Sequence, residues 1–303
     1  HTGDSGHDIN ARWGNILASL DWKKNFSDDL HLNTLIYYTR SNTDVGLWDK
    51  QWLVGNSNTL NITDRVLQER NYSRLHDISA KADLDWIPSE YHHIRAGAAY
   101  IQHLFRPRKV FTMNSTENGE EAYSDNDSYS IDYNASEVAV YAEDEIALAS
   151  WFKANIGLRY DMFSQGDNTY HSFEPRAALR FQLCPMASLK MSYTEMSQPV
   201  HLLHSHYLDI PMTSWLPSTD RIPPTRSRQA AGGIYMNLPH GIVLNIEGYW
   251  KRMDNMYEYS GIEILYPDIE KWEHDLMRGK GRSYGAEVEL GWKTKDTDIS
   301  AYY

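Results

Sequence analysis

The sequence has only one cysteine, Cys184, among its 303 residues. A single thiol can build neither a disulfide framework nor a thiolate zinc site. Basic residues are also scarce, since 29 Lys and Arg stand against 41 Asp and Glu and leave a net charge of −12. Because nucleic acid is bound through a basic surface, we expect no nucleic-acid partner.

Long apolar segments are missing as well. No run approaches the roughly 18 consecutive apolar residues of a transmembrane helix, and the mean hydropathy is −0.60. This does not exclude a membrane protein of another kind. A strand of about 9–11 residues crosses a bilayer when only every second residue is apolar, so averaged hydropathy does not detect a β-barrel.

Phenylalanine is the rare aromatic residue, with 7 Phe against 21 Tyr and 10 Trp. Rings that carry a polar end are favoured where one side is apolar and the other is wet. Four of the tryptophans lie near predicted short turns, and we expect them to form a girdle at one membrane interface: Trp22, Trp86, Trp151 and Trp292. The alternative is that they close the end of a soluble β-sandwich core.

The dominant sequence period is two, which is typical of strands with one apolar and one polar face. In "RSYGAEVELGWK", from Arg282, Val288 belongs to the apolar set and Glu289 to the polar set. The apolar set of this segment is Tyr284, Ala286, Val288, Leu290 and Trp292. The segment from Gly241 has a matching set, Ile242, Leu244, Ile246, Gly248 and Trp250.

The pattern predicts about twelve strands, at 12–23, 29–40, 72–87, 91–105, 132–148, 151–163, 172–183, 187–197, 226–238, 241–254, 281–293 and 297–303. Short turns alternate with long polar connections, which we place at 41–71, 106–131, 198–225 and 255–280, with a shorter loop near 164–171. A soluble sandwich rarely has so many long loops. An outer-membrane barrel does, with short periplasmic turns and long extracellular loops.

Four stretches in the second half resemble the middle of the barrel of TonB-dependent outer-membrane receptors. They are "SEVAVYAEDEIALASWFKANIGLRYD" followed by "FEPRAALRF", then "LKMSYTEMSQPVHLL", "PPTRSRQAAGGIYMNL" and "GKGRSYGAEVEL", in family order over 136–293. The resemblance implies an all-β fold, an antiparallel transmembrane β-barrel. The family barrel has 22 strands, and this chain would cover about twelve of them.

The resemblance also implies the protein's surroundings and partners. We expect residues 1–303 to form one partial outer-membrane β-barrel domain, since the family's N-terminal plug, its TonB-box peptide and its C-terminal closing strands find no match. The expected location is the outer membrane of a Gram-negative bacterium. The expected partners are the TonB energy-transducing protein, acting through the plug, a small-molecule or oligomeric nutrient, and outer-membrane lipid. A surface lipoprotein and the oligomeric state are left open.

The implied function is the binding and active import of a scarce nutrient, such as a ferric chelate, haem, a cobamide or a glycan. We expect no cofactor, no resident metal and no catalytic residues. A rival hypothesis is an outer-membrane barrel enzyme in which His204 or His206 acts beside a carboxylate on lipid or peptide. A third is a soluble metal-binding β-protein.

The candidate binding residues lie in the 198–225 loop, on the long-loop side, where this family holds its ligands. His201, His204 and His206 fall within six positions. His204 and His206 would project from one side of an extended loop, which favours a two-histidine contact with iron, haem or another transition metal. Asp209, Tyr207 and Trp215 are candidate co-contacts. His201 belongs to the "HLL" that the resemblance covers, so packing is the alternative for it, as surface decoration is for the others.

Overall fold

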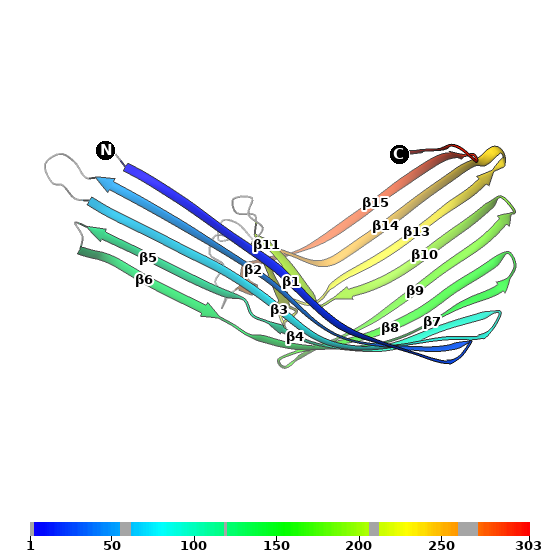
Figure 1. The fold of residues 1–303 in the computed structure, drawn as a ribbon, viewed down its shortest axis with the longest axis horizontal. Helices are drawn as coiled ribbons and strands as arrows, with labels where there is room; N and C mark the ends of the chain where they lie inside the picture. The colour runs from blue at the N-terminus through cyan, green and yellow to red at the C-terminus, as the bar shows by residue number, and fades with distance from the viewer. Residues whose placement is uncertain (1–2, 55–61, 118–119, 206–211, 260–271) are drawn as a thin grey trace.

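A computed structural model describes residues 3–54, 62–117, 120–205, 212–259 and 272–303. They form one long, curved antiparallel sheet and a small separate hairpin (Figure 1). The strands are β1 (Gly3–Ser27), β2 (Leu30–Val54), β3 (Ile62–Ser89), β4 (His92–Phe105), β5 (Arg108–Glu117), β6 (Glu120–Ser130), β7 (Tyr133–Ala149), β8 (Phe152–Gln165), β9 (Asn168–Cys184), β10 (Ala187–Gln198), β11 (Val200–Ser205), β12 (Met212–Pro217), β13 (Thr225–Leu238), β14 (Ile242–Tyr259), β15 (Leu276–Lys293) and β16 (Asp298–Tyr302). Short 3-10 turns lie at Pro239–Gly241 and Trp272–His274. Within these ranges no helix has the length and apolar character needed to cross a bilayer.

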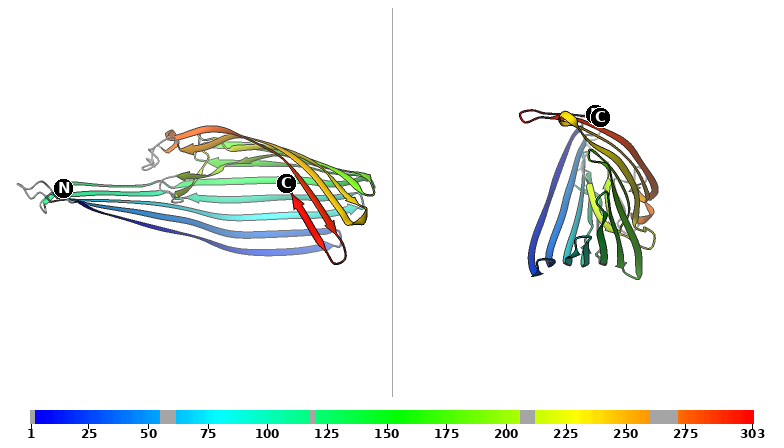
Figure 2. Two further views of the ribbon diagram at one scale, coloured as in Figure 1. Left: turned by 90° about the horizontal axis from the view of Figure 1, so that it is seen from above. Right: turned by 90° about the vertical axis from the view of Figure 1, so that its right-hand side faces the viewer.

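The main sheet runs in the order β1-β2-β3-β4-β7-β8-β9-β10-β13-β14-β15-β16. These twelve strands match the twelve predicted ones in number and order, and the all-β barrel-wall prediction is confirmed. Each strand of this path pairs with its predecessor in an antiparallel ladder, as short hairpin turns permit. In the described part of the chain, β1 and β16 are the two ends of the path, so the sheet is an open, curved wall (Figure 2).

Two of the four predicted long connections, and the predicted shorter loop, are wrong in part. The 41–71 region continues β2 to Val54 and starts β3 at Ile62, and 106–131 forms the β5–β6 hairpin. The loop expected near 164–171 shrinks to a tight turn in which Gly166 has a φ of +58°. The outer segments form strands because β3 is long enough to pair with β4 along one half and with β5 along the other. These ladders satisfy the backbone hydrogen-bonding groups even where the side chains do not alternate between apolar and polar.

The ladder register shows which residues share a face, because directly paired residues project to the same side of a sheet. One continuous row is apolar and faces outward: Phe152, Phe181, Leu189, Ile234, Ile246 and Val288. The adjacent row faces the concave side and is mostly polar: Lys153, Arg180, Lys190, Gly233, Glu247 and Glu287. The predicted division of β14 and β15 into an apolar and a polar face is confirmed.

Aromatic residues border the outward apolar surface at both ends. Near the short turns, Trp22, Trp86, Trp151 and Trp292 are between 42% and 57% exposed, as the girdle prediction requires. At the other end, four outward tyrosines direct their hydroxyl groups at polar side chains farther from the short turns, in the pairs Tyr38–His76, Tyr100–Gln102, Tyr160–His171 and Tyr193–Glu195. We call these four the tyrosine row. Two such girdles are the expected boundaries of a lipid-facing band.

Candidate functional site

The β11–β12 hairpin lies inside the hollow of the curved sheet, in the region predicted as a structureless loop (Figure 2). Its two strands pair from Val200 with Pro217 to Ser205 with Met212. The backbone N–H of Trp215 donates to Oγ of Ser73 in β3, at 3.2 Å. β12 contacts β2, β3 and β4, whereas β11 contacts β14, so the hairpin connects parts of the wall that are far apart in strand order.

Two apolar clusters hold the hairpin in place. In the first, Val200 and Trp215 pack against concave-face residues of β3, β4, β7 and β8, namely Leu75, Phe105, Ala135 and Phe163. In the second, hairpin and loop side chains pack with the ends of the last long strands: Leu203, Leu216, Ile222, Tyr259 and Trp272. Fully burying one side chain of this size contributes roughly 1.5–3 kcal/mol. The hairpin thus covers an apolar part of a concave face that is polar along much of its length.

His201 is a buried residue at the base of the hairpin, only 6% exposed. Its Nε2 lies 2.9 Å from Oγ of Ser218, and its Nδ1 lies 3.5 Å from Oγ1 of Thr225. The ring meets Tyr257 edge-on, with centroids 5.2 Å apart. Burial lowers the pKa of His201 to about 4, so the imidazole is neutral at physiological pH. The geometry supports a packing and hydrogen-bonding role for this residue.

The other predicted contacts are placed only in part. Trp215 is half-buried and packs in the first apolar cluster. His204 lies in β11, where its backbone pairs with Thr213. His206, Tyr207 and Asp209 fall in the connection between β11 and β12, outside the described residues. No group of three or more His, Cys, Asp or Glu in the described ranges is arranged to hold a metal ion.

The sequence did not predict an ionic network that lies on the concave face. His103 places Nδ1 2.8 Å from Asp77 and Nε2 3.7 Å from Glu137. The side chains come from three neighbouring strands, β4, β3 and β7. The alternation along each strand predicts that His103, Asp77 and Glu137 face inward. Only the pairing register between the strands shows that the three residues lie side by side. His103 alone gave no such indication, since a single histidine on a strand has many roles.

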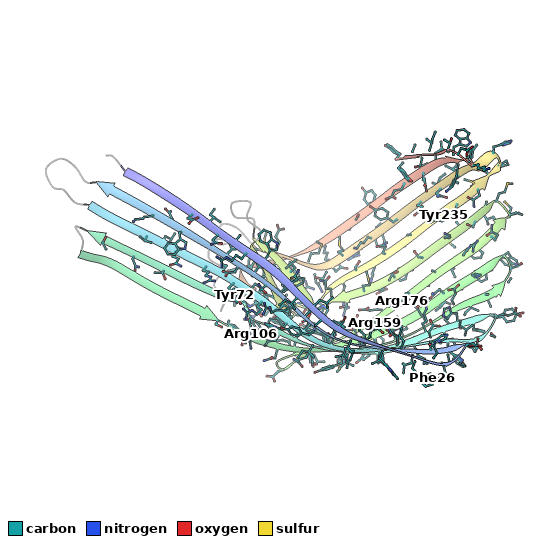
Figure 3. The ribbon with its side chains drawn as sticks, viewed as in Figure 1. Phe26, Tyr72, Arg106, Arg159, Arg176 and Tyr235 are labelled. Atoms are coloured by element: carbon teal, nitrogen blue, oxygen red, sulfur yellow. The ribbon has the colours of Figure 1, made fainter. Side chains whose placement is uncertain are left out.

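The network continues through Arg159 of β8. Its guanidinium lies 2.7 Å from Asp161, 3.4 Å from Glu137 and 3.8 Å from Glu174. Glu174 also accepts the backbone N–H of Ser197 at 2.9 Å. Arg159 and Arg176 project from the neighbouring strands β8 and β9 (Figure 3). These ion pairs make this part of the concave surface hydrophilic, with more carboxylates than cations among the residues named.

A hollow of about 400 Å³ lies nearer the short turns, on β8, β9, β10, β13 and β14. Small residues form its base, among them Ala178, Ala231 and Gly233, and charged ones surround it, including Arg180, Lys190 and Glu247. Such a surface can bind a polar solute or another protein segment without catalysing a reaction. The site as a whole therefore has the character of a binding and passage surface.

Comparison with known proteins gives one family and several structures. Residues 1–303 match the family described as "TonB dependent receptor-like, beta-barrel". No curated protein sequence matches the chain. Because the similar solved structures below are all less than 25% identical to this chain, they support the fold alone.

Three similar structures cover nearly the whole chain. The RagAB peptide importer in its closed-closed state has a TM-score of 0.57 and 14% identity over 98% of this chain and 36% of that one. The FrpB iron transporter from Neisseria meningitidis has a TM-score of 0.52 and 12% identity over 96% and 50%. FpvA of P. aeruginosa bound to heterologous pyoverdines has a TM-score of 0.52 and 10% identity over 97% and 50%. The chain thus spans half or less of the length of these proteins.

Proposed function

Since the chain belongs to the TonB-dependent receptor β-barrel family, we propose that the complete protein binds a scarce nutrient at the cell surface and imports it actively. Proteins of this family reside in the outer membrane of Gram-negative bacteria, and this chain is an outer-membrane barrel wall. The observation that carries the proposal is the hairpin held across the polar concave face. It lies in the hollow of the wall, on the face that a solute passing through the barrel would contact.

The two faces of the wall support transport through its interior. The outward face has apolar rows between two aromatic girdles and suits lipid. The concave face carries the Arg159 network and the charged hollow, and suits water and polar cargo. Import then needs an energy source, which in the proposal is TonB acting on a plug outside this chain. A surface lipoprotein is a further proposed partner.

The proposed cargo is a ferric chelate, haem, a cobamide or a glycan. A peptide joins this group because one similar structure is a peptide importer. We assign His204, His206 and Tyr207 to cargo contact, since they lie at and beyond the end of β11. Trp215 and His201 act as the residues that hold the hairpin. Two imidazoles leave coordination positions open, which suits a site that must release its cargo.

The test is growth of a strain that lacks the gene, with and without the full-length gene restored. Haem, ferric chelates, cobamides, glycans and oligopeptides are each supplied as the only source of a limiting nutrient. We expect one class to require the gene and also to require TonB. Growth that never depends on the gene, or depends on it but not on TonB, contradicts active import. Product release from lipid or peptide by the purified protein would instead favour the enzyme hypothesis.

The histidine assignment has its own test in the same strain. The double variant His204→Ala/His206→Ala should weaken uptake of the nutrient identified above. Acidification from pH 7.5 to pH 5.5 should weaken uptake by wild type more than by the double variant, because imidazole protonates near pH 6.5. Unchanged uptake by the double variant at both pH values assigns these residues to the loop surface.

A further inference from the structure

The wall changes height abruptly between β6 and β8. β5 pairs with β3 on one side and with β6 on the other. β8 runs beside β7 only as far as the pair Ala135–Gln165, and the chain then turns back into β9. In the described part of the chain β6 therefore has β5 as its only neighbour, and it borders the outer part of the sheet (Figure 1). We call the unpaired side of β6, over residues 120–130, the free edge.

The free edge lies outside the membrane-spanning part of the wall. Val140 of β7 pairs with Tyr160, a member of the tyrosine row that borders the lipid-facing band. The near end of β6, at Ser130, precedes Val140 by ten residues, and a strand rises about 3.3 Å per residue. β6 therefore begins about 30 Å beyond the tyrosine row along the chain, on the long-loop side. Its surroundings are aqueous, so membrane lipid is not its partner.

The free edge is long and regular. β6 has 11 residues and no proline, whereas an ordinary strand has about 5–6 residues. Its ladder with β5 runs without a register shift from Tyr123 to Ser130. Short length, proline and bulges are the devices by which proteins usually prevent an exposed edge from pairing. Most of β6 lacks them, so its outer N–H and C=O groups are a template for a further strand.

The charge of β6 decides which strand would fit. Its sequence, "EEAYSDNDSYS", contains Glu120, Glu121, Asp125 and Asp127 and no Lys, Arg or His. Like charges opposite each other in a strand pair are destabilising, and opposite charges are stabilising. Two copies of β6 would repel each other, which argues against a second copy of this chain. A strand with Lys or Arg at alternate positions is complementary, because Asp125 and Asp127 stand at alternate positions of β6.

From this geometry we propose that the free edge binds a basic, extended segment of a partner protein at the cell surface, which adds to the outer sheet as one more strand. Backbone hydrogen bonds supply the affinity in this mode of recognition, and alternate side chains supply the specificity. The acidic residues attract a basic strand and disfavour an acidic one. The proposal depends on the orientation of the wall in the outer membrane and holds whichever nutrient the receptor imports.

The test measures the binding of three synthetic peptides of the length of β6 to the full-length receptor, purified in detergent. The first alternates Lys and Thr, and the second alternates Glu and Thr. The third has the Lys and Thr sequence with every backbone nitrogen methylated, so it keeps the charge but cannot donate to a ladder. The first peptide should bind at least about tenfold more tightly than either of the others. It should also slow the hydrogen exchange of amides within 120–130.

A pair of variants tests the position of the contact. Asp125→Lys/Asp127→Lys should weaken binding of the Lys and Thr peptide by at least about tenfold, because the edge becomes basic. The matched control is Asp4→Lys/Asp8→Lys, which changes the net charge equally. Asp8 of β1 lies in the same cross-strand row as Asn126 of β6. Four strand spacings separate them, about 19 Å, which exceeds the screening length at physiological salt, so the control should stay within about twofold of wild type.

Three results would overturn the proposal. The first is equal affinity for the methylated peptide, which would show attraction between charges without strand addition. The second is equal loss in the β6 variant and the control. The third is slowed exchange that lies outside 120–130. A heat-dependent gel shift reports whether each variant is a folded barrel. If the β6 variant does not fold, the three peptides and hydrogen exchange on wild type decide.

Discussion

The outward and concave faces of β15 are made of alternating residues of one strand, and they follow opposite rules. Val288 and Leu290 face outward beside Ile246 and Leu244 of β14, and the charges on the outward face are found toward its two borders. Glu287 and Glu289 face the hollow, and Glu289 accepts a hydrogen bond from Asn245 at 2.6 Å. The medium that each face meets determines which side chains it tolerates, so a substitution has to be judged by the face it occupies.

The largest difference is expected from placing one charge on either face of β15. Val288→Arg puts a cation near the middle of the lipid-facing band and should cost about 2–4 kcal/mol, which reduces the amount of assembled barrel. Glu289→Arg puts the same cation in the hollow and should assemble normally. The measurement is the heat-shifted fraction of the full-length protein in outer membranes. Equal assembly of the two variants, or the reverse order, would contradict the assignment of Val288 to lipid and Glu289 to the hollow.

A second difference concerns glycines on the two faces. A Cβ at Gly97, on the concave face, would lie 2.6 Å from Cε1 of Tyr141 and 2.7 Å from the carbonyl oxygen of Ala82. At Gly248, on the outward face, the nearest atom would be 3.7 Å away. Gly97→Ala should therefore cost about 1–3 kcal/mol of unfolding free energy, and Gly248→Ala should cost little. Urea titration of the full-length barrel measures both, and equal midpoints would contradict the close packing of Tyr141.

The contrast between the two faces also determines how much of the fold could be predicted from the sequence. The parts of the twelve strands between the girdles alternate because one face meets lipid and the other meets water, and they were predicted in order. In the outer part of β2, "SNTDVGLWDKQWLV", both faces carry polar residues. The sequence therefore shows no period-two pattern there, although the segment is a strand. The same is true of β5 and β6. Those segments are held in the sheet by backbone hydrogen bonds between strands, which the side-chain pattern does not indicate.

The candidate site was predictable in location but not in form. Sequence reasoning selected the 198–225 region and its histidines. It could not place the hairpin in the hollow, because that depends on Trp215 meeting Ser73, 142 positions earlier. Nor could it show that His201 is buried against Ser218 and Tyr257. Contacts between distant parts of the chain decide both points, and they become visible only with the register of the sheet.

A third, smaller effect is a pH dependence of the hairpin. His201 has a pKa of about 4 in place, against about 6.5 when released, so the released state binds more protons between these values. Hairpin attachment is therefore fully stable above about pH 6.5 and weakens as the pH falls, by at most about 1.4 kcal/mol per pH unit. Hydrogen exchange of β11 and β12 at pH 7 and pH 5, corrected for intrinsic rates, measures this.

The control for the pH effect is His201→Gln, which keeps a hydrogen-bonding group near Ser218 but does not titrate. Its protection should change less between the two pH values than that of wild type. The same pH response in both proteins would place the titrating group elsewhere.

The smallest expected effect comes from one contact above the concave face. Nε1 of Trp272 donates to the hydroxyl of Tyr133 at 2.8 Å, which joins the segment before β15 to β7. Trp272→Phe and Tyr133→Phe should each cost about 0.5–1.5 kcal/mol, and the double variant should cost less than their sum. A double-mutant cycle in urea measures the coupling. Strictly additive costs would show that the two groups do not interact.

The central claim is that one face of the wall meets lipid and the other meets the barrel interior. It is tested most directly with single spin labels at 286, 287, 288, 289 and 290, in full-length protein carrying Cys184→Ser and embedded in a bilayer. Collisions with dissolved oxygen, which concentrates in lipid, report the environment of each label. We expect high collision rates at 286, 288 and 290 and low rates at 287 and 289. Rates that do not alternate, or that alternate in the opposite phase, would contradict it.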